Sequence, residues 1–443
     1  MNWRAFAALL ALVAGLALVT GLLMLVRRPS TATFFLTGDT EGLLVPCGCR
    51  TTPSGGLARR ATLLEQLRKD PEAGLVIPVE MAHGFADRGP GRDLLNRAMG
   101  AFFRERDCRV GVGSYDLAPG LATLRGWAPG VRLYGAGIEG LEAYEDLALG
   151  GWGVGPFGAR GQVLRVLFLS ETAPGGAALP PPLATFRRLR AVPGADAWVV
   201  FGNLSPETVA ALVKEAPDLL AVVACWHNSV TSLPQRAGAT WLVFNGDKGR
   251  RYTALTVGRI AGSWSVWPRG GFLGPEVASL PEAQRGAESV LARVAALNRA
   301  ALERQSAAAG PRPYAGTSSC RPCHAEAHRL WSLSRHARAT ADLAIDHQES
   351  NPDCLACHAT GTGRPGGYPG APGGPDLAGV GCEACHGPAA GHPPAPVPRG
   401  DATAEACGGC HTGRDSPSFD AAGYWQLIRH PAGAAPAPAA TGR

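Results

Sequence analysis

The chain has 443 residues, and at roughly 100–200 residues per domain it must contain at least two folded units. Its 42 Lys and Arg residues against 36 Asp and Glu residues leave a formal net charge of +6. No basic stripe interleaved with aromatic residues is present, so nucleic acid is not an expected partner. Gly (59) and Pro (37) are abundant, and charged residues make up only 18%, below the ~25% of an ordinary soluble domain. Part of the chain is therefore rich in loops, or is held together by something other than side chains.

An apolar segment near the amino terminus predicts a membrane anchor. Residues 5–26 are an uninterrupted run of apolar and small residues, and about 20 such residues span a ~30 Å hydrocarbon core. The flanking charges, Arg4 before it and Arg27 with Arg28 after it, barely orient the segment. A cleaved signal peptide is the alternative, because residues 30–32 form a small-x-small site, but the run exceeds the usual ~7–15 residues. We expect residues 1–32 to be a transmembrane anchor or signal segment, and we favour the uncleaved anchor.

Residues 33–275 alternate short apolar runs with helical patterns. The runs typical of buried strands are 33–37, 75–79, 109–112, 163–169, 197–201, 219–224, 240–244 and 252–257. Helical patterns cover 56–69, 93–106 and 207–215. This alternation predicts a layered α/β domain around a mixed sheet. A helix rich in Ala and Arg over residues 281–305 is expected in a linker of residues 276–310.

Several motifs of this segment resemble the calcineurin-like metallophosphoesterases, specifically the amino-terminal domain of bacterial 5′-nucleotidases and sugar diphosphatases. The matching runs are Leu36-Thr-Gly-Asp39-Thr-Glu41-Gly42 with Pro46, Gly55-Gly-Leu-Ala-Arg59-Arg-Ala-Thr62, Gly113 to Gly120, Asp218 to His227, and Gly246-Asp-Lys-Gly249-Arg250. The resemblance implies the layered fold of that family. It also implies a place for two metal ions, which in that chemistry clamp the attacking and leaving oxygens.

The positions where those metal ligands would lie depart from the family's pattern. Asp39 remains, but Glu41 replaces a histidine, and Glu80-Met-Ala-His83 stands where the bridging aspartate belongs. The other departures are Ser114-Tyr115-Asp116 for an Asn-His-Glu block, Gly202 or Asn203 for a histidine, and Cys225-Trp226-His227-Asn228 for Gly-His-x-His. Too few ligands remain for a dinuclear centre. We expect a non-catalytic scaffold, with a single-metal site, a thiol-based site or residual phosphoesterase activity as alternatives.

Four cysteines lie in this domain, namely Cys47, Cys49, Cys108 and Cys225. An oxidising compartment would favour one or two disulfides among them. A redox-active or metal-binding thiol cluster and unpaired buried cysteines are the alternatives, and the Cys-x-Cys spacing does not choose between them.

The last third of the chain contains four motifs of the form Cys-x-x-Cys-His. They are Cys320-Arg-Pro-Cys323-His324, Cys354-Leu-Ala-Cys357-His358, Cys382-Glu-Ala-Cys385-His386 and Cys407-Gly-Gly-Cys410-His411. Each reads as a c-type haem attachment site. Cysteines at i and i+3 lie on one side of a helical turn, so both sulfurs reach the vinyl groups of one porphyrin, and the histidine becomes the proximal iron ligand. Zinc sites also use paired Cys-x-x-Cys units, but they do not need a histidine after every pair. We therefore expect four covalently bound haem c groups.

Haem also accounts for the unusual composition of this region. Only eleven of the 117 residues from 314 to 430 are Leu, Ile, Val or Phe, a fraction that would ordinarily predict disorder. Four porphyrins would supply the missing apolar mass. The expected fold is a mainly α, loop-rich tetrahaem domain over residues 311–432, followed by a disordered tail of residues 433–443.

The second axial ligands are expected to be histidines. All four methionines (Met1, Met24, Met81 and Met99) lie outside the region, so His/Met coordination within it is excluded. The additional histidines are His328, His336, His347, His392 and His430. His336, His392 and His430 are the expected distal ligands, and either His347 or His328 completes the fourth haem. If neither does, one haem is five-coordinate and can bind a small ligand.

The same region resembles the multihaem cytochromes related to tetrahaem cytochrome c. The matching runs are Tyr314-Ala-Gly-Thr-Ser-Ser-Cys320 with Trp331 and His336, Cys357-His358-Ala-Thr-Gly361, Gly381-Cys-Glu-Ala-Cys-His-Gly-Pro388 with His392, and Cys410-His411-Thr with Ser416, Trp425 and His430. The resemblance implies closely packed haems between which electrons hop. It also implies that His336, His392 and His430 are distal ligands.

Together these features predict a periplasmic, membrane-anchored tetrahaem cytochrome that transfers electrons between redox partners of the respiratory chain or periplasm. Thioether attachment takes place on the outer face of the energy-transducing membrane, so everything after Arg28 should be periplasmic, with one span in the inner membrane. The alternative is an oxidoreductase that acts on a small nitrogen or sulfur species through an open haem or the thiols. We expect electron transfer rather than catalysis.

Overall fold

The computed structural model divides the chain into two compact units. Unit 1 comprises Met1–Asp87 and Leu95–Ala287, and unit 2 comprises Arg88–Leu94 and Glu288–Arg443. The structure describes residues 15, 30–46, 53–87, 89, 91–150, 161–226, 233–260, 262–308, 313–346, 348–370, 376–398, 402–411, 416 and 419–430. Within these ranges no helix combines the length and the apolar character needed to cross a bilayer. Apart from Gly15, the predicted anchor of residues 5–26 lies outside the described residues.

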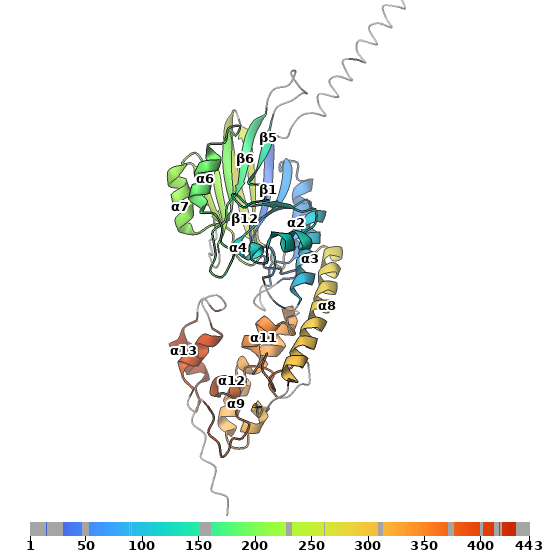
Figure 1. Cartoon of the computed structure of the whole chain (residues 1–443), viewed down its shortest axis with the longest axis vertical. Helices are drawn as coiled ribbons and strands as arrows, with labels where there is room; N and C mark the ends of the chain where they lie inside the picture. The colour runs from blue at the N-terminus through green and yellow to red at the C-terminus, as the bar shows by residue number, and fades with distance from the viewer. Residues whose placement is uncertain are drawn as a thin grey trace, which may run out of the picture. The chain divides into compact units, whose positions relative to one another are not determined.

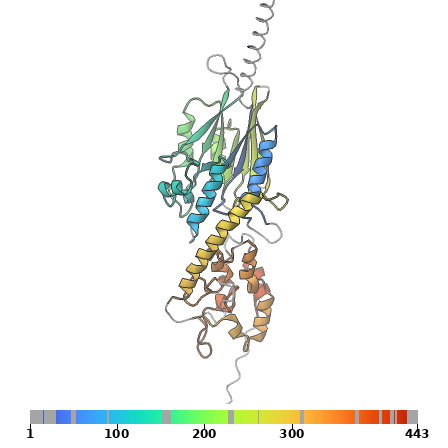
Figure 2. The same cartoon turned by 90° about the vertical axis from the view of Figure 1, so that its right-hand side faces the viewer.

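Unit 1 is built on two six-stranded sheets with helices on their outer faces (Figures 1 and 2). The first sheet has the order β12-β11-β1-β2-β3-β4, in which β1 to β4 are parallel, β11 pairs antiparallel with β1, and β12 pairs antiparallel with β11. The second has the order β5-β6-β7-β8-β10-β9, parallel from β6 to β10. The strands are β1 (Thr31–Thr37), β2 (Leu75–Glu80), β3 (Arg109–Gly111), β4 (Arg132–Tyr134), β5 (Tyr144–Leu149), β6 (Gln162–Phe168), β7 (Ala197–Asn203), β8 (Ala221–Cys225), β9 (Gln235–Ala237), β10 (Thr240–Phe244), β11 (Arg251–Ile260) and β12 (Ser263–Phe272).

The main core of unit 1 lies between the two sheets. Phe34 of β1 packs edge-on against Phe201 of β7, with ring centres 5.2 Å apart, and Leu255 of β11 belongs to the same buried cluster. A second cluster lies between the second sheet and the helices α6 (Pro182–Arg190) and α7 (Pro206–Glu215). Figure 1 shows these helices on one side of the sheets and α2 (Leu57–Lys69) and α3 (Arg92–Glu105) on the other. The layered α/β fold predicted from the sequence is therefore confirmed.

All eight predicted strands are present within a few residues, whereas four further strands were not predicted. β4 and β9 have only three residues each, β5 is partly exposed, and β12 alternates half-buried and exposed positions at a sheet edge. Such strands lack the continuous apolar run that marks a strand buried on both faces. The helices α4 (Ser114–Leu117), α5 (Leu121–Trp127) and α6 were also not predicted.

Unit 2 consists of short helices joined by loops. The helix predicted over residues 281–305 is present as α8 (Pro281–Ser306), and the division between the units falls within it. Beyond it come η2 (Thr317–Cys320), α9 (Ala325–Leu333), η3 (His336–Arg338), α10 (Ala339–Asp342), η4 (Leu343–Asp346), α11 (Pro352–His358), α12 (Cys382–His386), η5 (Ala404–Gly409) and α13 (Ala421–Ile428). The buried apolar cluster of this unit is small, comprising Leu302, Leu343, Leu355, Ala359, Tyr368 and Leu377.

A half-buried ion pair joins the two sheets of unit 1. Both carboxylate oxygens of Glu145 in β5 accept hydrogen bonds of 2.8 Å from the guanidinium of Arg109 in β3, and the hydroxyl of Tyr134 donates a third at 3.1 Å. Burial alone would raise the pKa of Glu145, but Arg109 and Tyr134 outweigh it and lower this pKa below its usual value. The ionised carboxylate therefore stabilises the fold.

We expect Glu145→Gln to lower the free energy of unfolding of unit 1 by about 1.5–3 kcal/mol at neutral pH, because hydrogen bonds to a charged group are lost. Since the folded pKa is the lower one, the contribution of Glu145 is complete above the unfolded pKa and is lost as the pH falls through the folded pKa. Urea-dependent hydrogen exchange of the β5 amides at neutral and acid pH measures this difference.

The matched control is Glu215→Gln. Glu215 pairs with Arg187 at 2.7 Å, but the Arg187 side chain is 64% exposed, so solvent screens the interaction and no measurable loss is expected. An equal loss in both variants, or a Glu145→Gln effect that does not change with pH, would contradict the assignment.

Candidate functional site

Each of the four Cys-x-x-Cys-His motifs forms a helical turn. The second motif ends α11, and the third makes up the whole of α12. In the first and fourth motifs, the backbone N–H of the histidine donates to the carbonyl of the first cysteine, at 2.8 Å for His324 and 2.9 Å for His411. None of the eight motif cysteines, all of which lie among the described residues, forms a disulfide. This is the local geometry that lets two thiols reach one porphyrin while the following imidazole turns towards its iron.

Three motif histidines face a second histidine from another part of the chain. The ring centres of His324 and His392 lie 6.2 Å apart, those of His336 and His411 lie 6.4 Å apart, and those of His386 and His430 lie 5.8 Å apart. In each pair one ring comes from a motif and the other is a histidine that the sequence predicts as a distal ligand. The sequence did not predict which motif each distal histidine faces.

The separations suit a metal ion between the rings. Metal–imidazole bonds are about 2 Å long, and with roughly 1 Å from nitrogen to ring centre, two rings on one ion have centres about 6 Å apart. Direct ring stacking would allow centres as close as about 4.5 Å. The residues present therefore fit haem with two axial histidines at three of the four motifs.

Hydrogen bonds hold several of these rings at Nδ1. The Nδ1 atom of His358 lies 2.9 Å from the carbonyl of Ala339, that of His392 lies 2.9 Å from the carbonyl of Ala395, and that of His411 lies 3.0 Å from the hydroxyl of Ser416. A partner at Nδ1 fixes the ring and leaves Nε2 as the coordinating atom.

The remaining motif histidine, His358 of the second motif, has no second imidazole in ring contact among the described residues. The ring of His328 lies beside Trp331 instead, with centres 5.3 Å apart. His347 lies outside the described residues. The ligand opposite His358 therefore stays a prediction, with His347, His328 and an open position as the three alternatives.

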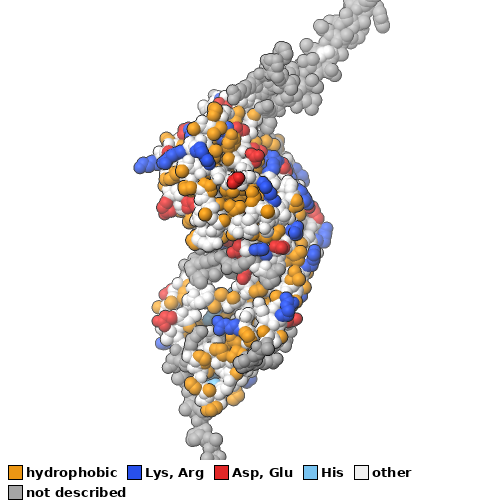
Figure 3. Space-filling view, viewed as in Figure 1, with side chains coloured by type: hydrophobic (Ala, Val, Ile, Leu, Met, Phe, Trp, Pro, Cys, Tyr) orange, Lys and Arg blue, Asp and Glu red, His pale blue; other side chains and the backbone are white. Residues whose placement is uncertain are grey.

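The environment of the motifs also fits a bulky apolar group. No residue of α9 or α13 is buried, and even large apolar side chains of these helices are exposed, Leu333 to 73% and Leu427 to 79%. Figure 3 shows apolar side chains at the surface of this unit. Cys320 and Cys382, from the first and third motifs, share a hydrogen bond that lowers the pKa of Cys320 to about 7. The attachment points of these two motifs are therefore neighbours.

A buried carboxylate inside the third motif organises the surrounding loops. Glu383 is 4% exposed and accepts hydrogen bonds from the backbone N–H groups of Ala315 and Gly316 at 2.8 Å and of Ala389 at 2.7 Å. It thereby ties the chain before the first motif and the chain after the third motif to α12. This role is not evident in the sequence, because the two x positions of such a motif carry no signal of their own.

A second group of polar side chains lies in unit 1, where β1, β2 and β3 end. We call Asp39, Arg60, Glu80, His83 and Asp116 the strand-end cluster, and every member is at most 3% exposed. Carboxyl ends of parallel strands meet at one edge of a sheet, which is where α/β proteins place their sites. Nδ1 of His83 lies 2.9 Å from Oδ1 of Asp39.

The electrostatics of this pair favour a charged histidine. Burial lowers the pKa of His83, but the hydrogen bond and charge of Asp39, together with the charges of Asp116 and Glu41, outweigh it and raise this pKa above its usual value. Burial raises the pKa of Asp116 to about 6, although His83 and three backbone N–H groups act in the opposite direction.

The other cysteines do not pair within the described residues. Cys108 and Cys225 are buried free thiols, so no disulfide joins them, while Cys47 and Cys49 lie outside the described residues. Burial raises the pKa of Cys108 to about 11 and that of Cys225 well above its usual value. Both thiols are therefore protonated and weakly nucleophilic. His227, predicted beside Cys225, also lies outside the described residues.

The strand-end cluster does not fit a dinuclear metal centre. Among the described residues, no three side chains of His, Cys, Asp or Glu are arranged to hold a metal ion. Asn203, which with Gly202 is one of the two residues expected in place of a histidine, donates its side-chain N–H to the carbonyl of Cys225 at 2.7 Å. The side chain of Asn203 is therefore engaged in a hydrogen bond within the protein.

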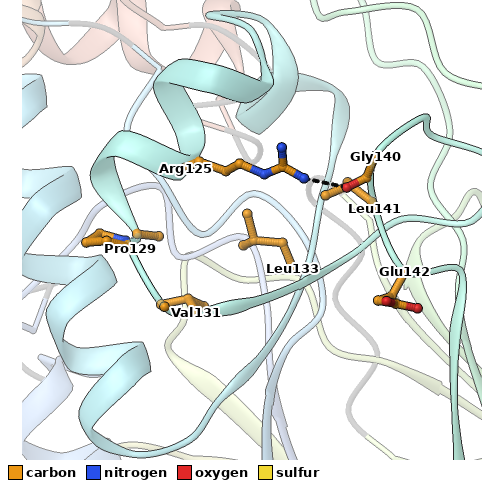
Figure 4. A pocket seen from close by; sticks show the side chains of 9 residues that line it. Arg125, Pro129, Val131, Leu133, Gly140, Leu141 and Glu142 are labelled. Atoms are coloured by element: carbon orange, nitrogen blue, oxygen red, sulfur yellow. Dashed lines mark hydrogen bonds between the residues drawn. The ribbon is translucent and has the colours of Figure 1, made fainter.

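A surface hollow of about 470 Å³ lies elsewhere in unit 1, beside α5 and β4 (Figure 4). Pro129, Val131, Leu133 and Leu141 line it, and the guanidinium of Arg125 donates to the carbonyl of Gly140 at 2.6 Å. It contains none of the site residues predicted from the sequence.

We expect Glu383→Gln to destabilise unit 2 by about 3 kcal/mol, because an amide cannot accept all three hydrogen bonds and would bring its own N–H against a backbone donor. The measurement is the urea midpoint of the haem absorption band of the full chain. Glu405→Gln is the control, because Glu405 is exposed in η5 before the fourth motif, and no shift is expected there. Equal midpoints for Glu383→Gln and wild type would disprove the role of this carboxylate.

The chain is similar to solved structures and to a curated protein. Solved structures similar to the chain include the sulfate thiohydrolase of Thermus thermophilus (15% identity, TM-score 0.47, 60% of this chain and 61% of that one). They also include a 5′-nucleotidase precursor, likewise from Thermus thermophilus (18%, 0.46, 64% and 63%), and the NAD nucleotidase of Haemophilus influenzae (12%, 0.49, 66% and 64%). We infer no activity from these likenesses.

The haem motifs have a closer relative. Residues 319–387 match the family model of cytochrome c554 and c-prime. An alignment over 92 positions, which covers 17% of this chain and 39% of cytochrome c-554 of Nitrosomonas europaea, shows 35% identity. The predicted resemblance to multihaem cytochromes is thus confirmed, and the carboxy-terminal region of this chain is similar to cytochrome c554, which supports covalently bound haem c and a role in electron transfer.

Proposed function

We propose that this chain is a membrane-anchored, periplasmic electron-transfer protein with four covalently bound haem c groups in residues 311–432. One observation carries the proposal, namely that three motif histidines each face a distant histidine at a separation of 5.8–6.4 Å between ring centres. When bound, haem c supplies an iron centre that gains and loses one electron. Electron transfer needs no substrate site at iron, and a pair of histidines holding each haem would leave no open position for a substrate.

The protein's own residues hold and orient the groups. The cysteines at the first and fourth positions of each motif provide the thioether bonds, and His324, His358, His386 and His411 provide the proximal imidazoles. The distal imidazoles are those of His336, His392 and His430, with His347 or His328 for the fourth group. The backbone and hydroxyl oxygens at Nδ1 of His358, His392 and His411 fix the rings and make their Nε2 atoms better donors.

The absence of methionine from residues 314–430 supports low reduction potentials. Bis-histidine ligation leaves these potentials below those of the His/Met cytochromes. Partners are other redox proteins of the respiratory chain or periplasm, recognised in part by charge. Residues 301–443 contain eleven Arg against twelve Asp and Glu, so the haem propionates would make this region more acidic and suited to basic partners.

The location follows from the chemistry of attachment. Thioether formation outside the cytoplasm, together with the apolar run of residues 5–26, supports one span in the inner membrane with the rest of the chain in the periplasm. Membrane fractionation with protease treatment of spheroplasts tests this location.

A second candidate function rests on His358, which has no imidazole in ring contact among the described residues. An open face at this position would make the chain an oxidoreductase for a small nitrogen or sulfur species. A high-spin ferric signal with carbon monoxide binding in the wild type would favour this function over pure electron transfer.

We expect four haems per chain to remain attached after acid–acetone extraction, and removal of a distal ligand to open one of them. His430→Ala should convert about a quarter of the low-spin ferric signal to high spin, because one of four irons loses an axial nitrogen. Electron paramagnetic resonance of protein with a measured haem content gives the fraction.

The control for this variant is Arg429→Ala, which changes the preceding residue and leaves the imidazole in place. Its spectrum should equal that of the wild type. Loss of all haem on extraction would refute covalent attachment, and an unchanged spectrum for His430→Ala would refute ligation by His430.

A further inference from the structure

The carboxylates of the strand-end cluster all have partners within the protein. Glu80 accepts from the guanidinium of Arg60 at 2.6 Å and from the hydroxyls of Thr37 at 2.8 Å and Thr40 at 2.7 Å. Asp116 accepts from three backbone N–H groups, those of His83 at 2.7 Å, Gly113 at 2.9 Å and Phe85 at 3.1 Å. Metal ligands must offer free lone pairs, and these two carboxylates have few left to offer.

Asp39 is the remaining carboxylate, and its Oδ1 atom is hydrogen-bonded to Nδ1 of His83. Its second oxygen, Oδ2, and the Nε2 atom of His83 are buried and have no hydrogen-bond partner among the described residues. The two atoms face different neighbours. Oδ2 of Asp39 lies close to Gly246, where an added Cβ atom would come within 2.9 Å of it. Nε2 of His83 lies close to Gly113, where an added Cβ atom would come within 2.5 Å of it. Because Nε2 points away from Nδ1 and hence from Asp39, one cation cannot bind both atoms.

The backbone fixes this arrangement. The loops after β1 and β2 are joined by hydrogen bonds from Asp39 N–H to the carbonyl of Ala82 at 2.9 Å and from Glu41 N–H to the carbonyl of His83 at 2.8 Å. Asp39, Glu41 and His83 all have positive φ angles, of 52°, 49° and 54°. Non-glycine residues adopt this conformation only when their surroundings hold them in it, and such strain concentrates at sites. The imidazole is therefore placed beside Asp39 by the fold itself.

We propose that the strand-end cluster is a metal-free site, in which the imidazole of His83 fills the place that a cation would take beside Asp39, while the backbone N–H of the same residue donates to Asp116. A buried carboxylate needs a positive partner, and a metal ion or a protonated side chain can supply it. Here the chain supplies the charge from the loop after β2. Unit 1 thus keeps the charge balance of a metal site without binding a metal ion, and it cannot clamp a phosphate ester between two cations.

Metal analysis and calorimetry of the full haem-loaded chain test this proposal. Wild type produced in medium with added Mn²⁺ and Zn²⁺ should carry no stoichiometric metal beyond haem iron, and neither EDTA nor MnCl₂ should shift the melting transition of unit 1. A metal bound in stoichiometric amount, with loss of thermal stability in EDTA, would overturn the proposal.

His83→Asn provides the converse test. Asparagine tolerates positive φ but is neutral, so Asp39 loses its cationic partner. The variant should melt at a lower temperature than wild type, and Mn²⁺ at tenfold excess over its dissociation constant should raise its melting temperature by about 3–6 °C. His83→Lys is the matched control, because it keeps a positive charge and should not respond to Mn²⁺. The proposal would also be overturned if Mn²⁺ left the melting temperature of His83→Asn unchanged, or if it raised the melting temperature of His83→Lys.

A strand-end cluster without metal in unit 1 does not depend on electron transfer by unit 2. If His83→Asn fails to fold, metal analysis of the wild type still decides the matter. Haem content and spin state report on unit 2, so the two proposals can fail separately.

Discussion

The constraint on which unit 2 depends is the shortage of apolar side chains in its sequence. A conventional domain of this length buries a continuous side-chain core, whereas here six residues form the buried apolar cluster and whole helices bury nothing. The polar contacts are nonetheless specific. The hydroxyl of Thr340 donates to the carbonyl of His358 and accepts from the N–H of Gly379. The carboxylate of Glu383 accepts hydrogen bonds from three backbone N–H groups. These contacts position the motif turns, and the porphyrins would complete the interior between them.

Unit 1 solves a different problem, that of burying charge. Its sheets supply an ample apolar core, and the groups that need compensation are carboxylates and guanidinium groups at the strand ends and between the sheets. Arg60 pairs with Glu80, Arg109 with Glu145, and His83 with Asp39. A charged group inside a protein is stable only when a partner and hydrogen bonds replace the lost water. The same rule underlies the proposal that His83 takes the place of a cation in the strand-end cluster.

The sequence predicted those features whose signal is local. Strands buried on both faces, such as β1, β7 and β8, have continuous apolar runs, and the haem motifs are contiguous pentapeptides. Features that depend on distant chain segments were not predicted. The pairing of His336 with His411 joins residues 75 positions apart, and the partnership of His83 with Asp39 requires two loops to lie side by side. Edge strands such as β12 were missed because half of their side chains face solvent.

The pairing of the histidines has a consequence for biosynthesis. The pairs His324–His392, His336–His411 and His386–His430 all cross one another along the chain, so none is nested within another. A chain emerging from the membrane in the direction of synthesis would expose three complete attachment motifs before a single one of these pairs could close. Every early intermediate would thus present open iron faces, and the last pair would close only when residue 430 had been translocated. With the proposed ligands, the order of the sequence would therefore make full axial ligation one of the final events of maturation.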